Sequence, residues 1–252
     1  MLRTRVIPCL LLRGQGLVKT VKFKNPTYVG DPINAVRIFN DKEVDELLFL
    51  DITATIERRP PQFDLIHDIA TECFMPFGYG GGVHDIETAQ KLLKLGSEKV
   101  VINSAATDPE LIKRAANEFG SQSVVVSIDV RYSRLSKYQV FTHSGTINTK
   151  KDPVQYAKDA EATGAGEIVL TSIDRDGTMV GYDINLIKMV ADSVNIPVVA
   201  CGGAGRLEHF QEAILKGGAS AVSAGSMFVF HGPHRAVLIN YPTQEQLEQY
   251  LP

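Results

Sequence analysis

Short apolar segments alternate with longer amphipathic segments along the whole chain. The apolar segments are rich in Val, Ile and Leu, and they predict strands near residues 5–12, 46–52, 75–79, 99–103, 124–129, 167–172, 196–201 and 221–225. The segments between them have the periodicity of helices, for example at residues 85–95, 109–119, 153–163 and 207–216. This alternation is typical of βα units around a parallel sheet, whose strands are buried on both faces.

An internal repeat indicates how these units are arranged. The segment PFGYGGGVHDIETAQKLLKLGSEKVVIN, which begins at Pro76, aligns without gaps with PVVACGGAGRLEHFQEAILKGGASAVSA, which begins at Pro197. The offset is close to half the chain, and it also aligns DELLFLDI with GEIVLTSI. A solenoid would show several shorter periods. Eight strands, eight helical segments and a two-fold half-barrel repeat therefore predict a closed (β/α)8 TIM barrel of the α/β class.

The length and composition fit one soluble unit. The chain has 252 residues, close to the ~250 of a one-domain barrel, so we expect residues 1–252 to form a single domain. Apolar residues make up 44% of the chain and the net charge is −3, so nothing indicates a nucleic acid as partner. No apolar run is long enough to span a bilayer and no signal peptide is recognisable, so we expect a cytoplasmic protein.

Three cysteines, Cys9, Cys73 and Cys201, fit no metal-binding spacing. They lie in apolar surroundings and are predicted to be buried, reduced thiols. We expect neither a metal ion nor a cofactor.

Glycine-rich turns follow repeat-related strands, at the end of the barrel where ligands of such folds bind. Glycine lets backbone N–H groups approach an anion closely, and a following helix adds its positive end. A tight βα turn needs glycine in any case, but two such turns on opposite sides of one barrel predict two phosphate sites facing each other across the mouth. The candidate residues are Gly81, Gly82, Asn103, Ser104, Gly202, Gly203, Gly225 and Ser226.

A carboxylate ends the fifth predicted strand, VVVSIDV. Partial burial would raise the pKa of Asp129 and suit it to general acid–base chemistry, although a helix cap or a loop salt bridge also explains an aspartate there. Candidates for contacts to a phosphate or ribose follow the sixth strand, where a simple turn is the alternative. These are Thr171, Ser172, Asp174, Asp176 and Gly177.

Charged residues lie at or near the amino ends of four predicted strands: Arg5, Glu46, Lys99 and Glu167. Two positive and two negative side chains at the barrel floor can close into a ring. Residues at this end of a barrel usually serve stability. A stabilising plug and a functional ring are both consistent with the sequence at this point.

Long, distinctive motifs are distributed from residue 1 to about residue 228. They are RVIPCL, GDP at Gly30, DELLFLDITA, GYGGGV, KVVINSAA, FGSQSVVVSID, GAGEIVLTSIDRDGT, GYD and ACGGAG. Together they resemble the cyclase subunit of imidazole glycerol phosphate synthase. From Val229 onward, the segment containing HGPHRAVLINYP is unlike the ordinary last loop and helix of that family.

The resemblance implies a partner and a reaction. Family members bind a glutaminase subunit at the barrel floor and receive ammonia through the barrel interior. The ammonia attacks a bisphosphorylated formimino ribotide, giving imidazole glycerol phosphate and an aminoimidazole carboxamide ribotide in histidine biosynthesis, so the implied activity is that of a lyase. The family's charged gate at the ammonia entrance matches Arg5, Glu46, Lys99 and Glu167. Its phosphate-binding positions match Gly82, Asn103, Asp176, Gly177, Gly203 and Ser226, and Lys19 of its mobile first loop is also present.

One position departs from the family pattern. The family uses two aspartates as general acid and base, at the ends of the first and fifth strands. Asp129 supplies the second, but Leu11 stands where the first is expected. Leucine can neither accept nor donate a proton. Since such groups are worth ~10²–10⁴ in rate, the loss is expected nearly to silence cyclisation.

Four readings follow. The first is a cyclase of histidine biosynthesis. The second is a paralogue that keeps the gate and the glutaminase-binding surface but passes ammonia to a sugar amidotransferase, for the synthesis of surface polysaccharide (acetamidino sugars). A binding module and the sister isomerase of histidine biosynthesis are weaker alternatives. We favour ammonia handling over full cyclase activity, because a conduit needs the gate but needs no carboxylate at the position of Leu11.

Overall fold

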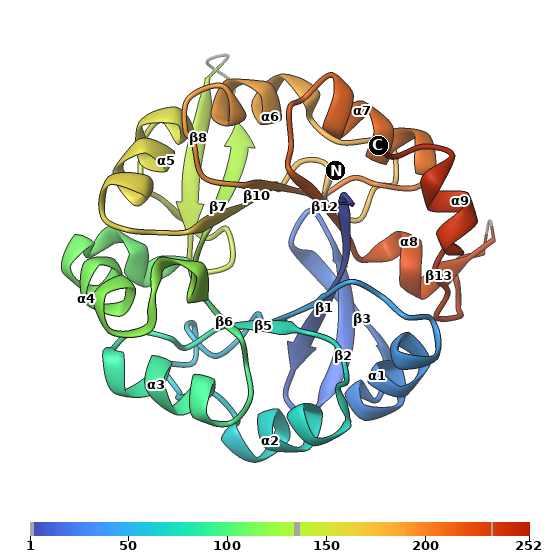
Figure 1. Ribbon diagram of the computed structural model, residues 1–252, viewed down its shortest axis with the longest axis horizontal. Helices are drawn as coiled ribbons and strands as arrows, with labels where there is room; N and C mark the ends of the chain where they lie inside the picture. The colour runs from blue at the N-terminus through green and yellow to red at the C-terminus, as the bar shows by residue number, and fades with distance from the viewer. Residues whose placement is uncertain (1–2, 134–136, 233) are drawn as a thin grey trace.

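The computed structural model describes residues 3–133, 137–232 and 234–252. Eight parallel strands form a closed barrel, in the order β10-β11-β12-β1-β4-β5-β6-β7, and β7 pairs with β10 to complete the ring (Figure 1). The predicted TIM barrel is confirmed. The barrel strands are β1 (Arg5–Arg13), β4 (Leu47–Asp51), β5 (Phe77–Gly80), β6 (Lys99–Ile102), β7 (Val124–Tyr132), β10 (Glu167–Ser172), β11 (Val198–Cys201) and β12 (Ala221–Ala224).

An outer ring of helices covers the barrel strands (Figure 1). Five of these helices begin at an aspartate whose carboxylate accepts a hydrogen bond from a backbone N–H of the first turn, which satisfies a donor that has no partner within the helix. The helices are α1 (Pro32–Asp41), α2 (Phe63–Glu72), α3 (Ile86–Lys94), α4 (Pro109–Phe119), α5 (Pro153–Ala162), α6 (Ile184–Ala191) and α7 (Leu207–Leu215).

The eighth unit differs from the other seven, as the unfamiliar sequence from Val229 indicates. After β12 the chain forms only the single turn α8 (Ser226–Val229), followed by the strands β13 (Phe230–His231) and β14 (Ala236–Val237) and the short helix α9 (Gln244–Glu248). The unfamiliar segment from Val229 thus replaces the last outer helix. Tyr241 anchors it, donating its hydroxyl hydrogen to the carbonyl oxygen of Val6 at 3.0 Å.

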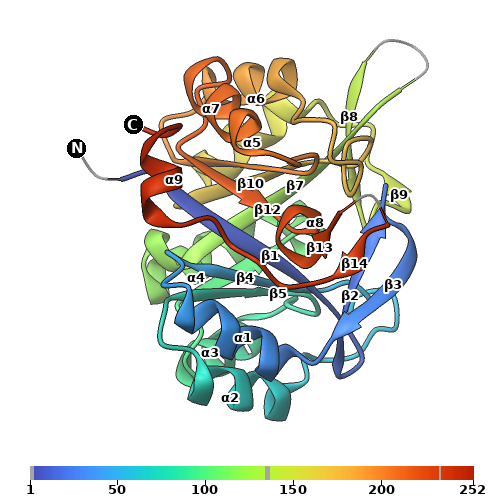
Figure 2. The same cartoon turned by 90° about the vertical axis from the view of Figure 1, so that its right-hand side faces the viewer.

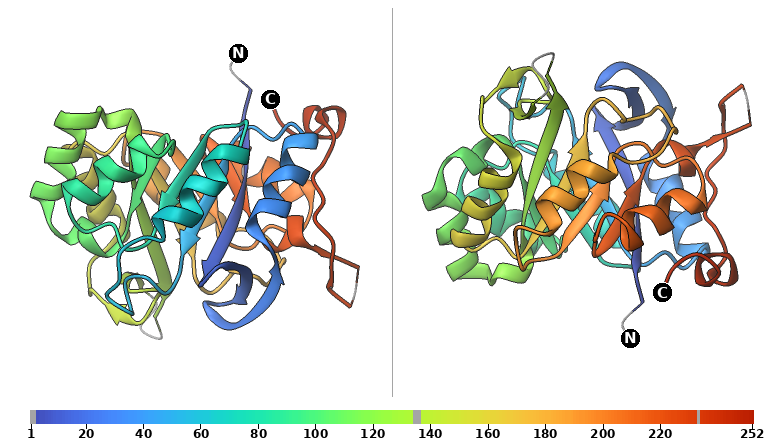
Figure 3. Two further views of the ribbon diagram at one scale, coloured as in Figure 1. Left: turned by 90° about the horizontal axis from the view of Figure 1, so that it is seen from below. Right: turned by 90° about the horizontal axis from the view of Figure 1, so that it is seen from above.

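Two further hairpins extend the barrel strands. β2 (Gly16–Val21) pairs antiparallel with the end of β1 and with β3 (Lys24–Gly30), and β8 (Tyr138–Thr142) pairs antiparallel with the end of β7 and with β9 (Ile147–Asn148). Each hairpin is attached at the carboxyl end of a barrel strand. Figures 2 and 3 show them, with β13–β14, on the side of the barrel opposite the N-terminus.

The sequence repeat corresponds to a repeat in structure. Its two copies form β5-α3-β6 and β11-α7-β12. The residues that follow β6 and β12, Asn103 and Gly225, have almost the same backbone angles, with φ −112° and ψ −77° against φ −115° and ψ −67°. Each is followed by one short helical turn, the 3₁₀ helix η1 (Ser104–Thr107) after β6 and α8 after β12.

Apolar side chains pack on both faces of the strands, as parallel barrels require. One cluster lies between strands and helices, and a smaller cluster fills the barrel interior. The interior cluster comprises Ile7, Cys9, Leu11, Val18, Leu48, Val101, Val125, Val169, Val199, Cys201 and Ala221. In the part of the chain that the structure describes, no helix is long and apolar enough to cross a membrane.

Candidate functional site

A cavity of about 360 Å³ opens at the carboxyl ends of the barrel strands. It brings together residues that are far apart in the sequence but were all predicted to face the mouth. Its wall includes Leu11, Lys19, Gly81, Gly82, Asn103, Ser104, Asp129, Thr171, Asp176, Gly177, Gly202, Gly203, Gly225 and Ser226. Two other candidates lie outside it. Ser172 is buried away from the cavity, and Asp174 accepts a hydrogen bond from the backbone N–H of Tyr132 at 2.8 Å.

Asp129 is the carboxylate with the most strongly perturbed environment in this cavity. It is 8% exposed, and Asn103 Nδ2 donates a hydrogen bond to its Oδ2 at 3.1 Å. Burial, reinforced by the nearby Cys201 and Asp176, raises the pKa of Asp129 to about 7, although hydrogen bonds from Thr171 and Asn103 oppose the shift. A carboxyl group that titrates near neutral pH can hold or release a proton under physiological conditions.

We therefore predict that Asp129 titrates near neutral pH in the ligand-free protein. Because its folded pKa of about 7 lies above the ordinary value of 3.8, the folded state retains a proton that the unfolded state has lost. Below about pH 4 this carboxyl group is neutral in both the folded and the unfolded state. As the pH rises from 4 toward 7 it ionises in the unfolded state but not in the folded state, so the free energy of unfolding falls progressively. Asp129→Asn should be more stable than wild type above pH 7, by about 1–4 kcal/mol, and nearly equal to it at acid pH.

The measurement is denaturant unfolding of both proteins across that pH range, together with the ¹³C chemical shift of the Asp129 carboxyl group. Asp174→Asn provides a control from outside the cavity. A titration midpoint of Asp129 near its ordinary value would contradict the prediction.

Leu11 lies on β1, which is four strands away from β7 in either direction around the ring and so stands on the opposite side of the mouth from Asp129. The side chains around Leu11 are apolar. It is 7% exposed and packs in the interior cluster with Val18 and Leu50. Two further carboxylates line the cavity, and both are engaged. Asp176 forms an ion pair with Lys19, and Asp51 forms one with Arg59. Among the described residues, neither of these two carboxylates takes the place of an aspartate at position 11, because each is held by its own cation.

Lys19 and Asp176 form a buried ion pair that fastens the β2–β3 hairpin to the loop after β10. Lys19 Nζ lies 2.9 Å from Asp176 Oδ1, and the Thr20 hydroxyl donates to Asp176 Oδ2 at 2.9 Å. Burial alone would lower the pKa of Lys19, but the charge and hydrogen bond of Asp176, together with the nearby Cys9 and Cys201, outweigh it and the pKa is raised. The first loop forms a β2–β3 hairpin that closes one side of the mouth.

The glycine turns are required by close backbone contacts. Gly81 and Gly203 have φ of 114° and 117°, and a Cβ atom on either residue would lie within 2.4 Å of a carbonyl oxygen. These glycines are thus explained by packing as well as by anion binding. Ser226 gives a separate indication, because its buried hydroxyl lines the cavity and has no hydrogen-bond partner among the described residues. A ligand oxygen at this end of the cavity would supply the missing partner.

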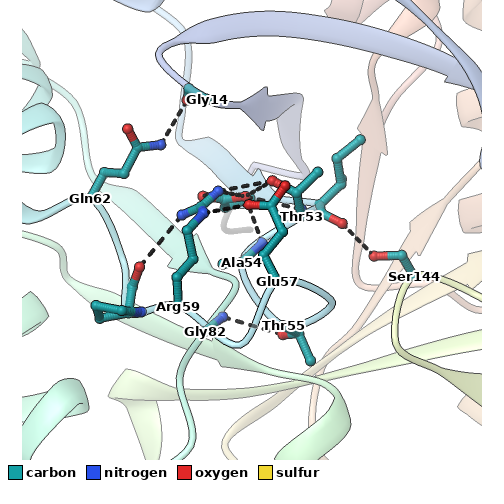
Figure 4. Close-up of polar contacts among 12 residues, drawn as sticks. Gly14, Thr53, Ala54, Thr55, Glu57, Arg59, Gln62, Gly82 and Ser144 are labelled. Atoms are coloured by element: carbon teal, nitrogen blue, oxygen red, sulfur yellow. Dashed lines mark hydrogen bonds and ion pairs between the residues drawn. The ribbon is translucent and has the colours of Figure 1, made fainter.

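The loop after β4 contributes residues that the sequence argument missed. Asp51 accepts hydrogen bonds from the backbone N–H groups of Thr53 and Ala54, and its ion pair with Arg59 measures 2.8 Å. Figure 4 shows this loop, with Thr55 next to the backbone N–H of Gly82. Arg58, Arg59, His84 and Ser144 also line the cavity. Asp51 follows the apolar run LLFL, so the signal that identified Asp129 was present there too.

The four charged residues at the barrel floor form a closed ring. Arg5 is ion-paired with Glu46 and Glu167, and Lys99 Nζ lies 2.7 Å from Glu46 Oε1 and 2.8 Å from Glu167 Oε2. Burial alone would raise the pKa of Glu167, but the hydrogen bond from Arg5 and the charge of Lys99 outweigh it and the pKa is lowered. Each carboxylate thus bridges both cations, and the ring closes the amino end of the barrel interior.

Two of the cysteines meet inside the barrel. Cys9 and Cys201 both belong to the interior cluster, and the proximity of the two thiols lowers the pKa of Cys201 to about 7, with help from Lys19, and raises that of Cys9. The prediction of buried thiols is right for these two and wrong for Cys73, which is only half-buried at the end of α2. Within residues 3–133, 137–232 and 234–252, no group of three or more His, Cys, Asp or Glu side chains is placed to hold a metal ion.

Comparisons with known proteins agree with this geometry. Residues 5–234 match the family model described as "Histidine biosynthesis protein". A Pseudomonas aeruginosa protein with the provisional name imidazole glycerol phosphate synthase subunit hisF2 is 54% identical over 249 residues, which cover 98% of this chain and 99% of that protein. A Leptospira borgpetersenii protein provisionally named subunit HisF of the same synthase is 49% identical over the whole of both chains. Subunit HisF of a Hydrogenobaculum species is 46% identical, over 91% of this chain and 92% of its own.

Proposed function

Because this chain belongs to the histidine biosynthesis protein family, we propose that it is an ammonia-handling subunit of HisF type. In this proposal a glutaminase docks on the barrel floor, ammonia enters through the charged ring, and it travels through the barrel to the mouth. The acceptor of the ammonia at the mouth is a separate enzyme, and this chain does not itself carry out the cyclisation of the family.

One combination of features carries the proposal, namely a complete floor ring together with a hydrocarbon at position 11. The ring of Arg5, Glu46, Lys99 and Glu167 has all four ion pairs. A stabilising plug alone would not need two buried carboxylates paired with two partly buried cations, since apolar residues of similar size stabilise at least as well. A conduit needs the ring but has no use for a second proton-transfer group at Leu11.

The side chains between ring and mouth suit a small neutral nucleophile. Ammonia is neutral and an ammonium ion is charged, so an apolar interior favours the reactive form. The interior-facing positions of β5 are Gly78 and Gly80, so this strand contributes no side chain of its own to the barrel interior.

The cavity at the mouth supports a second element of the proposal, a ligand with two phosphate ends. The turns at Gly81 and Gly203 lie in its wall, and the unpartnered Ser226 hydroxyl lies at one end. The cyclase of histidine biosynthesis remains the alternative function, and the names of the relatives in Leptospira and Hydrogenobaculum favour it. Leu11 favours the conduit, with a sugar amidotransferase of acetamidino sugar synthesis as the acceptor enzyme.

Gly78 offers a direct test of the route through the barrel. A Cβ atom on Gly78 would lie 3.5–3.6 Å from side-chain atoms of Leu48, Lys99 and Val101, so alanine fits without strain. A leucine would project into the interior just above the floor ring. We expect Gly78→Leu to reduce the transfer of glutamine-derived ammonia about tenfold or more, at a stability cost of about 1–3 kcal/mol. Gly78→Ala should transfer ammonia almost as wild type does.

The measurement is product formed by the acceptor enzyme with glutamine as nitrogen source, compared with the same reaction supplied with ammonium salt. Gly78→Leu should impair only the first. Equal rates for Gly78→Leu and Gly78→Ala with glutamine would argue against passage through the barrel.

A further inference from the structure

Large apolar side chains that are exposed to solvent are concentrated at one end of the barrel. Among the described residues eleven such side chains are exposed, and seven lie on the loops and hairpins at the carboxyl ends of the strands. Isolated exposed apolar residues are normal on protein surfaces. Their gathering at the mouth is what distinguishes this face. The seven are Tyr28, Ile56, Tyr132, Ile147, Val180, Val237 and Leu238.

The hairpins that carry most of these side chains are basic. Residues 13–30, 131–151 and 230–238 contain ten of the 26 Lys and Arg residues of the chain and none of its 29 Asp and Glu residues. The chain as a whole has a net charge of −3, so these three hairpins carry the opposite charge from the rest of the molecule. Among the described cations of these hairpins, Lys24, Lys137 and Arg235 are exposed and take part in no ion pair. Their charge is therefore available to a partner.

The hairpins stand around the opening of the cavity. β2 is paired with β1 at Leu11–Arg13, and β8 with β7 from Asp129 onward, so both start at the rim. β13–β14 also lies at the rim, because the Arg235 guanidinium donates to the carbonyl oxygen of Gly177 at 2.6 Å and Gly177 lines the cavity. Figure 3 shows the β2–β3 and β8 hairpins projecting beyond the end of the barrel opposite the N-terminus, and the β13–β14 hairpin projecting outward from the barrel wall. Any molecule seated on them would cover the mouth.

We propose that the three rim hairpins form the docking surface for the acceptor enzyme, a protein that presents an acidic surface with apolar residues around its own active-site entrance. This inference rests on the proposed function and specifies where the acceptor binds. Ammonia that escapes into water is protonated and loses its nucleophilic lone pair, so a conduit works only if its exit is sealed against solvent. The basic charge steers an acidic partner to the rim, and the apolar and aromatic side chains supply the buried contacts.

A protein partner fits this surface better than a nucleic acid does. Aliphatic side chains such as Ile147, Val237 and Leu238 offer no stacking platform for bases, whereas protein interfaces bury such groups. The two classes of partner are distinguished by experiment.

The test uses this chain in complex with a HisH-type glutaminase, and as probe a purified sugar amidotransferase of acetamidino sugar synthesis. Two double variants remove rim features, Lys24→Glu with Lys137→Glu for charge and Val237→Ser with Leu238→Ser for apolar area. Matched controls on the outer helices are Lys94→Glu with Lys113→Glu and Ile38→Ser with Met189→Ser, all exposed in the free protein. The dissociation constant of the probe is measured for each at low and high ionic strength.

We expect each rim variant to weaken binding about tenfold or more and the controls to change it less than about threefold. Wild-type binding should weaken as the ionic strength rises, and the charge variant should lose that dependence. Rim variants that bind the amidotransferase as tightly as wild type would overturn the proposal. Two further outcomes would also overturn it: rim-dependent dimers of this chain in sedimentation, or rim-dependent binding of single-stranded RNA without binding of the amidotransferase.

A separate readout distinguishes failure of this inference from failure of the proposed function. Rim variants should leave glutamine hydrolysis by the docked glutaminase unchanged and should lower only glutamine-dependent amination by the acceptor. If Gly78→Leu blocks that amination while the rim variants do not, the conduit stands and the docking surface is wrong. If wild type never supplies the acceptor from glutamine, the proposed function itself is wrong.

Discussion

Leu11→Asp should give this protein a cyclisation activity that the wild type lacks. With ammonium salt as nitrogen source, we expect the variant to convert the bisphosphorylated formimino ribotide about 10²–10⁴ times faster than wild type, which is the usual contribution of one positioned acid–base group. The new carboxylate would enter the mouth opposite Asp129, whose pKa of about 7 already suits proton transfer. The cavity that receives the substrate is present in both proteins.

The assay follows imidazole glycerol phosphate formed from the purified ribotide, without a glutaminase. Leu11→Asn is the matched control, since it places a polar group of the same shape that cannot ionise and should stay as slow as wild type. Leu11→Asp combined with Asp129→Asn should lose the gain. A wild-type rate equal to that of Leu11→Asp would show that another group replaces the missing aspartate, and the chain would then be a cyclase.

Lys99→Ala should uncouple glutamine hydrolysis from use of the ammonia. The substitution removes two ion pairs of the floor ring at once and leaves Glu46 and Glu167 bridged only by Arg5. Because these carboxylates are buried, we expect a loss of about 1–3 kcal/mol in stability, and an opening through which ammonia leaks at the interface. Glutamate released per product formed should rise several-fold.

Both quantities are measured in one reaction, glutamate and aminated product, with the glutaminase bound. Lys188→Ala is a suitable control, because Lys188 forms an exposed ion pair with Asp192 on α6, far from the barrel interior, and such pairs contribute little. If Lys99→Ala still assembles with the glutaminase and releases no more glutamate per aminated product than wild type, the ring is a stabilising plug and not a gate.

Most of the barrel could be predicted from hydrophobic periodicity. The strand at Glu167–Ser172 and the helix at Pro109–Phe119 have the predicted bounds, because burial on both faces of the strand and an aspartate-capped amphipathic helix leave clear signals. The convergence of the cavity residues was also predictable, since parallel strands bring their carboxyl ends to one rim.

The rim hairpins could not be predicted in the same way. β2 and β3 are short strands within what the pattern shows as a polar loop, and Pro26 in β3 is a residue that usually breaks a strand. They persist because β2 pairs with β1 and because Lys19 is held by Asp176, which lies 157 positions away in the sequence. The thiol contact of Cys9 with Cys201 likewise depends on barrel closure, which no local pattern encodes.

The segment that replaces the eighth outer helix runs the full height of the barrel. Its hairpin reaches Gly177 at one end, and at the other Gln244 of α9 accepts a hydrogen bond from Arg3, beside the strand that carries Arg5 (Figure 2). In an ordinary barrel the two ends communicate only through packed strands and helices. Here one covalent strap of some two dozen residues touches both, so occupancy at either end has a physical path to the other that bypasses the barrel wall.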